Sequence, residues 1–167
     1  IMKILILPGD GIGPEIVAVA DAALQALDRR FSIGLELDQQ DAGLAALQMA
    51  GTTLPTEVVA KARVADGVVL GPASTEDYPS AAKGGINISA WFRSQFDLYA
   101  NIRPSKIRVG VPGHVPEMDL IIVRENTEGF YADRNMVVGT GEFMPTPDVA
   151  LAVGKATTEG CRRIAVA

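Results

Sequence analysis

The chain has 167 residues, of which 48% are hydrophobic and 21% charged, and its formal net charge is −5. This composition is typical of a globular protein and excludes disordered, collagen-like and coiled-coil classes. The acidic balance, without a long basic run, argues against nucleic acid or a membrane surface as partner. The single Cys161 cannot form an internal disulfide, and we find neither a signal-peptide pattern nor a membrane-spanning stretch. We therefore expect a cytoplasmic protein.

Segments with the periodicity of strands alternate along the chain with segments of helical periodicity. Strands are expected at residues 3–7, 33–37, 67–70, 98–102 and 119–124. Helices are expected at residues 14–29, 42–49, 55–63, 89–95 and 147–163. Residues 74–85 are rich in Ser, Gly, Pro and charge, and we predict a long surface loop there. The alternation predicts an α/β fold with a largely parallel sheet and flanking helices.

The turn after the first predicted strand raises the question of a phosphate site. Residues 9–13 read G-D-G-I-G, whereas a dinucleotide-binding fingerprint places its third glycine three positions after the second. Asp10 and Glu15 would also repel an anionic ligand. We therefore expect a simple strand-to-helix turn, in which Asp10 caps the helix and Pro14 starts it.

Three arginines lie beside the later predicted elements. Arg93 is on the helix before a strand, Arg103 follows that strand, and Arg124 ends the next apolar run. Guanidinium groups at strand ends are suited to bidentate binding of a carboxylate or phosphate. The alternative is that each arginine pairs with a nearby acid, such as Asp97, Glu125 or Glu128. Three arginines together favour an anion site.

Three blocks of the sequence resemble one enzyme family in the same order along the chain. They are PGDGIGPE at 8–15, FRSQFDLYANIRP at 92–104 and VRENTEGFY at 123–131. The chain resembles the β-decarboxylating dehydrogenases, which include isocitrate, homoisocitrate, 3-isopropylmalate and tartrate dehydrogenases. The resemblance implies an isocitrate/isopropylmalate dehydrogenase-like α/β fold. It also implies that residues 1–98 form the N-terminal part of the large domain and 99–167 part of a second, substrate-binding and dimer-interface domain.

The resemblance further implies an NAD-dependent oxidative decarboxylation of a malate-type 2-hydroxy acid, with NADP as a possible cofactor. Arg93, Arg103 and Arg124 would hold the malate-like core of the substrate. Tyr131 would be the general acid that protonates the enol carbon after carbon dioxide leaves, a role that a neutral phenol can fill. The turn at 9–13 would border the adenine site, with Ile12 touching the cofactor.

The family's catalytic lysine, its Mg²⁺- or Mn²⁺-binding aspartates and its glycine-rich adenosine segment have no counterpart in these 167 residues. The resemblance is therefore to the N-terminal part of the family only, and the metal ligands would lie outside this segment. We expect this part alone to be inactive. The alternative is a non-catalytic truncated relative that acts as a regulatory or dimerising module.

The residues before Arg93 bear on substrate choice. Asn87 and Ser89 lie where isopropylmalate enzymes usually place leucines, and Ser89 precedes Arg93 by one helical turn. A hydroxyl there favours a polar substituent on the substrate. The alternative is that Asn87 and Ser89 only cap the helix. Isocitrate, homoisocitrate, tartrate and isopropylmalate remain open as substrates.

Residues 129–146 are too apolar for a free loop and contain strand-forming stretches. The apolar side chains that we expect to be exposed are Met136, Val137, Val138, Phe143 and Met144. In the family that the chain resembles, the corresponding arm pairs with that of a second subunit. We therefore predict a homodimer held partly by this arm.

Overall fold

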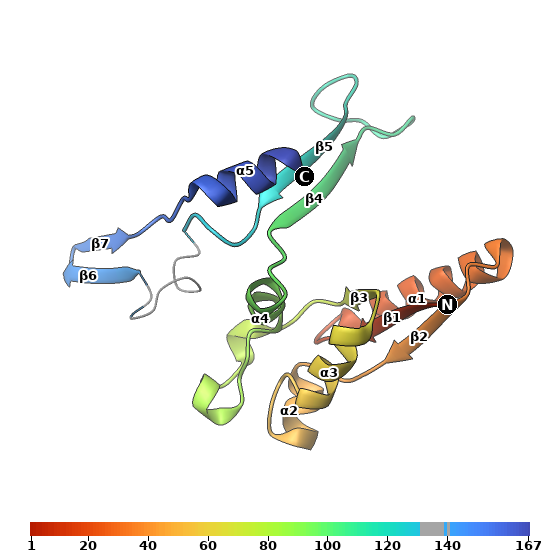
Figure 1. Ribbon diagram of the computed structural model, residues 1–167, viewed down its shortest axis with the longest axis horizontal. Coiled ribbons are helices and arrows are strands. Elements are labelled where there is room, and N and C mark those ends of the chain that lie inside the picture. Colours follow the sequence, from red (N-terminus) through yellow and green to blue (C-terminus); the bar gives the residue numbers. More distant parts are fainter. Residues whose placement is uncertain (131–138, 140) are drawn as a thin grey trace. The chain divides into compact units, whose positions relative to one another are not determined.

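The computed structural model describes residues 1–130, 139 and 141–167. The chain packs as two compact units, Ile1–Trp91 and Phe92–Ala167, which are described separately below (Figure 1). The predicted domain boundary between residues 98 and 99 concerns the whole protein and stays a prediction. Within the described ranges, we find no helix that combines the length and the apolar character needed to cross a membrane.

The first unit is built on a three-stranded parallel sheet in the order β2-β1-β3. The strands are β1 (Met2–Leu7), β2 (Leu35–Gln39) and β3 (Gly67–Leu70). The helices that connect them are α1 (Gly13–Phe31), α2 (Leu44–Ala50) and α3 (Thr56–Val64). Leu5, Ile6 and Leu7 of the central strand are buried in the core. The predicted α/β fold with a parallel sheet is confirmed in this unit.

The turn between β1 and α1 differs from its predicted structure in one respect. Asp10 does not cap α1, because the N-cap position is Ile12 and no side chain caps the helix there. The carboxylate of Asp10 is buried and accepts hydrogen bonds from Leu44 N (2.6 Å), Ser74 N (3.0 Å) and the Tyr78 hydroxyl (2.6 Å). These donors belong to distant segments that local sequence does not reveal. Asp10 thus ties the turn to two other loops.

The glycines of this turn allow two backbone segments to lie in close contact. Asp10 N donates to Pro72 O at 2.7 Å, so the turn lies directly against the loop after β3. A Cβ atom on Gly9 would overlap Pro72 O, and one on Gly13 would overlap Pro8 O. Gly9 also has a φ of 74°, a left-handed conformation that side chains disfavour. The glycine spacing therefore has a structural explanation that needs no phosphate.

The rest of the first unit leads to helix α4 (Ile88–Gln95). The predicted surface loop at 74–85 contains two short 3₁₀ helices, η1 (Thr75–Asp77) and η2 (Ala81–Lys83). Ile88 at the start of α4 is completely buried. The loop and helix were therefore both predicted close to their actual positions.

The second unit contains antiparallel ribbons rather than a parallel sheet. Strands β4 (Ala100–Lys106) and β5 (Asp119–Glu125) form one ribbon, and β6 (Glu142–Thr146) and β7 (Val149–Ala152) form another. Helix α5 spans Thr158–Val166. In Figure 1, α5 runs alongside β5.

The predicted helix over residues 147–163 is wrong in its first half. Residues 149–152 form β7, which pairs with β6, and the helix starts only at Thr158. The side chain of Thr157 accepts a hydrogen bond from Gly160 N at 3.0 Å and so fixes this start. The spacing of apolar residues in this stretch is compatible with a strand as well as with a helix. Pairing with β6 makes residues 149–152 a strand.

We predict that Gly9→Ala destabilises the protein much more than Gly51→Ala does. The two glycines have nearly equal φ angles of 74° and 72°, but Cβ space is open at Gly51. The left-handed conformation should cost about 1–2 kcal/mol in each variant. The overlap with Pro72 O should add about 1–3 kcal/mol in Gly9→Ala alone. Denaturant unfolding measures both free energies, and equal losses would contradict the close-approach explanation.

Candidate functional site

The register of the β4–β5 ribbon brings Arg103 and Arg124 onto one face. Arg124 pairs with Asn101, and Arg103 pairs with Ile122. Directly paired residues of an antiparallel ladder share a face, as do residues two positions apart on one strand. Arg103 and Arg124 are therefore diagonal neighbours, with a separation of about 7–8 Å expected between such positions. Both are exposed, and Arg103 Nε donates to Asn101 Oδ1 at 3.2 Å.

A tight polar turn follows β5. The carboxylate of Glu125 accepts hydrogen bonds from Thr127 N (2.9 Å), Thr127 Oγ1 (2.7 Å) and Glu128 N (2.6 Å). Burial raises the pKa of Glu125, but these hydrogen bonds outweigh it and hold the pKa below its ordinary value. Glu125 is thus ionised near neutral pH and serves to shape the turn.

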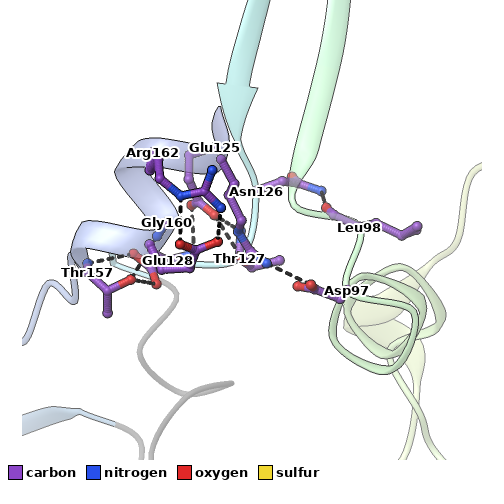
Figure 2. Close-up of polar contacts among 11 residues, drawn as sticks. Asp97, Leu98, Glu125, Asn126, Thr127, Glu128, Thr157, Gly160 and Arg162 are labelled. Carbon is purple, nitrogen blue, oxygen red and sulfur yellow. Dashed lines mark hydrogen bonds and ion pairs between the residues drawn. The ribbon is translucent and has the colours of Figure 1, made fainter. Parts of the chain in front are cut away.

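The same turn is fastened to the start of α5, as Figure 2 shows. Glu128 accepts hydrogen bonds from Thr157 Oγ1 at 2.7 Å and Thr157 N at 2.9 Å. These two bonds lower the pKa of Glu128. Gly160 lies so near that a Cβ there would overlap the Glu128 carboxylate. The first turn of α5 therefore holds Glu128 in one place.

Arg163 on α5 connects two parts of the second unit. Its Nη1 donates to Asp97 Oδ2 at 2.7 Å and its Nη2 to Thr127 Oγ1 at 2.8 Å. Its guanidinium carbon also lies 4.6 Å from the centre of the Tyr99 ring. Asp97 is one of the acids that could have paired with Arg93, Arg103 or Arg124, and it pairs with Arg163. Glu125 and Glu128 likewise accept from neighbouring backbone and threonine groups.

Arg93 lines a polar cavity of about 270 Å³ in the second unit. The other lining residues are Ser94, Asp97, Asn126, Thr127, Glu128, Lys155 and Arg163. Three cations and two carboxylates line this space, and both carboxylates already accept the hydrogen bonds described above. The excess of positive charge in the lining suits the binding of a small anion. Asn126 Oδ1 and Arg163 Nε are buried and have no hydrogen-bond partner among residues 1–130, 139 and 141–167.

Arg124 lines a different, larger cavity of about 540 Å³. Phe130, Cys161 and Ile164 give this cavity an apolar wall, and Glu128 and Lys155 line both cavities. The structure therefore brings Arg103 and Arg124 together by register, and relates Arg93 and Arg124 through two cavities that share lining residues.

The predicted site residues of the first unit lie at two places. Ile12 is 60% exposed on the turn before α1, where an apolar side chain can contact a ligand. Asn87 Oδ1 accepts a hydrogen bond from Ala90 N at 2.9 Å and so caps α4, as the alternative interpretation expected. Ser89 is half-buried in the first turn of that helix. Roles for these residues in binding stay predictions.

Tyr131 lies outside the described residues, as do Met136, Val137 and Val138. Phe143 and Met144 are exposed, as predicted. Across the described ranges, no cluster of three or more His, Cys, Asp or Glu side chains could hold a metal ion. This part of the chain therefore does not fit a complete metal site.

Asn126, Lys155 and Arg163 are site residues that were not predicted from the sequence. Arg163 is 66 residues away from Asp97 in the sequence, and no local pattern links the two. For Asn126 a signal did exist, because it lies two residues after Arg124 within a conspicuously polar stretch. A polar residue directly after an apolar strand is a reasonable site candidate.

Comparisons with known proteins agree with the observed fold. The model of the isocitrate/isopropylmalate dehydrogenase family matches residues 3–167. The chain is 38% identical to 3-isopropylmalate dehydrogenase of Methanothermobacter thermautotrophicus, over 98% of this chain and 44% of the relative. It is 36% identical to isocitrate/homoisocitrate dehydrogenase of Thermus thermophilus, over 79% of this chain and 37% of the relative.

Solved structures give the same result. The crystal structure of isocitrate dehydrogenase from Methylococcus capsulatus aligns with a TM-score of 0.75 at 31% identity, over 98% of this chain and 45% of that chain. The chain thus spans less than half the length of these relatives. The family match, the relatives and the fold agree, and the chain belongs to the isocitrate/isopropylmalate dehydrogenase family.

Proposed function

We propose that the chain is the N-terminal part of an enzyme that oxidises and decarboxylates a malate-type 2-hydroxy acid. The observation that carries this proposal is the shared face of Arg103 and Arg124 on the β4–β5 ribbon. Two guanidinium groups at this spacing can each bind a carboxylate of a dicarboxylic acid. The cavity beside Arg93 supplies a further cationic position in the same unit.

Substrate choice is proposed to depend on the start of α4. Ser89 offers a hydroxyl one turn before Arg93 on that helix. A hydroxyl can hydrogen-bond a polar substituent on the substrate, whereas an apolar substituent would leave it without a partner. This favours isocitrate, homoisocitrate or tartrate over isopropylmalate as the substrate.

We propose NAD, with NADP as the alternative, as the cofactor, which when bound accepts the hydride from the 2-hydroxyl carbon. Ile12 is exposed, and Gly11 beside it has open space where a side chain would be, so the turn can contact a ring edge. Mg²⁺ or Mn²⁺ is proposed to be bound by residues beyond these 167. The function of the present residues is to bind and orient the hydroxy acid, and to protonate the product carbon through Tyr131.

We expect Arg103→Lys in the full-length protein to lower kcat/KM for the hydroxy acid by about 10- to 100-fold, because an ammonium cannot form the paired hydrogen bonds of a guanidinium. Arg108→Lys, at an exposed position beyond β4, is the matched control and should be neutral. Steady-state kinetics measures kcat/KM for both variants, and circular dichroism checks that both are folded. Equal kinetics for both variants would remove Arg103 from the site.

Tyr131→Phe should keep ring packing and remove only the proton donor. The overall oxidative decarboxylation should fall by about 100- to 10,000-fold, the loss typical of a general acid. Reduction of a 2-oxo acid analogue that needs no protonation at carbon should fall much less. Measuring the rates of both reactions over the same range of pH makes this comparison. Equal losses would assign Tyr131 to substrate positioning instead.

A homodimer through residues 129–146 is also proposed, supported by the exposed apolar side chains on the β6–β7 ribbon. Phe143 is 55% exposed, Met144 65% and Leu151 47%. Such surface favours burial against a second copy. The full-length protein should sediment as a dimer at micromolar concentration, and Phe143→Asp should shift it towards the monomer. His114→Asp, at an exposed position in the loop between β4 and β5, is the control. A monomeric wild-type protein would contradict the arm's role.

A further inference from the structure

Thr53 is completely buried in the first unit and holds a distant segment by its hydroxyl. Its Oγ1 donates to Ile86 O at 2.8 Å and accepts from Ile86 N at 2.8 Å. Its backbone N donates to Gly84 O at 2.9 Å. One small side chain therefore satisfies both backbone groups of Ile86, across 33 residues of sequence.

The backbone around Thr53 is connected in turn to the glycine-rich turn. Gly43 N donates to Thr53 O at 2.8 Å, and Leu44 N, the next amide, donates to Asp10 Oδ1 at 2.6 Å. A set of part-buried hydrogen bonds thus runs from the turn that carries Ile12 to Ile86. All of these residues lie within the first unit.

Ile86 directly precedes the helix that carries the proposed substrate contacts. Asn87 caps α4, Ile88 is completely buried, and Ser89 follows in the first turn. Because the cap and the buried anchor leave little freedom between Ile86 and Ser89, the place of Ile86 fixes the start of the helix. The hydrogen bonds between Thr53 and Ile86 therefore lie directly before the helix start that carries Ser89.

We propose that Thr53 is a positioning residue for substrate selection, acting through Ile86 on Ser89. This inference rests on the proposed function, in which Ser89 contacts a polar substituent of the hydroxy acid. Valine has nearly the shape of threonine but cannot hydrogen-bond, so Thr53→Val would take from Ile86 N and O the partner that they have beside the buried Thr53 side chain. The segment must then move to find other partners, and Ser89 moves with it. Serine at position 53 would keep the hydroxyl.

The test uses the full-length protein and compares malate, which has no substituent, with whichever of isocitrate, homoisocitrate and tartrate the wild type oxidises fastest. Each of these three acids has a polar substituent, and isocitrate stands for the chosen acid below. Thr53→Val should lower kcat/KM for isocitrate by about 10-fold or more, as expected for a misplaced contact, and that for malate by less than about 3-fold. Thr53→Ser should resemble wild type. Thr53→Cys, with weaker hydrogen bonds, should be intermediate and keeps the comparison available where valine prevents folding.

A second measurement identifies the route of the effect. Thr53→Val added to Ser89→Ala should cost little beyond Ser89→Ala alone, since both remove the same contact. Amide hydrogen exchange over residues 84–90 should be faster in Thr53→Val than in Thr53→Ser. Equal losses for isocitrate and malate, additive double-mutant effects or unchanged exchange would each overturn the role of Thr53. A wild-type enzyme that oxidises none of isocitrate, homoisocitrate, tartrate and malate would instead overturn the proposed function, and Arg103→Lys tests that function independently.

Discussion

The first unit depends on one buried carboxylate, that of Asp10. A buried charge is costly unless it is hydrogen-bonded, and Asp10 receives its donors from α2, from the loop after β3 and from Tyr78. Gly43 leaves the space that the carboxylate occupies, since a Cβ there would overlap it. Burial, with the hydrogen bond to Asp10, raises the pKa of Tyr78, so its hydroxyl remains a donor at all moderate pH values. The turn that carries Ile12 is therefore held in place by the side chain of Asp10, which belongs to the same turn.

In the second unit the corresponding constraint is strand register. A shift of one residue between β4 and β5 would change which side chains face Arg124, and would separate it from Arg103. The turn after β5 and the cap of α5 hold the end of this ribbon through Glu125 and Glu128. Their contribution is to keep the polar cavity in a fixed shape beside the arginines.

Local patterns in the sequence predicted most of the fold and few of the contacts. The strand at residues 67–70 and the helix near 89–95 were predicted closely because their apolar spacing or their caps lie within the element itself. The prediction of a helix over residues 147–163 was wrong in its first half because residues 149–152 pair with β6 as strand β7. Asp10 was misassigned since its partners are 34 to 68 residues away. Arg124 was correctly predicted near the end of a strand, whereas Arg103 lies in the middle of β4 (Ala100–Lys106) and not after a strand, because the strand extends beyond its predicted end. The common face of Arg103 and Arg124 follows from the register, and the contacts of Arg163 follow only from the folded chain.

The central position of β1 has a consequence for synthesis of the protein. Leu5, Ile6 and Leu7 are almost fully buried, yet both neighbours of their strand come later in the chain. On the ribosome this apolar strand emerges before both of its partners and must wait for β2 at Leu35–Gln39 and then for β3 at Gly67–Leu70. Parallel pairing over such separations is slow, and an unpaired apolar strand is prone to aggregation meanwhile. The stretch most important for the finished core is thus the one that most needs protection while the chain is being made.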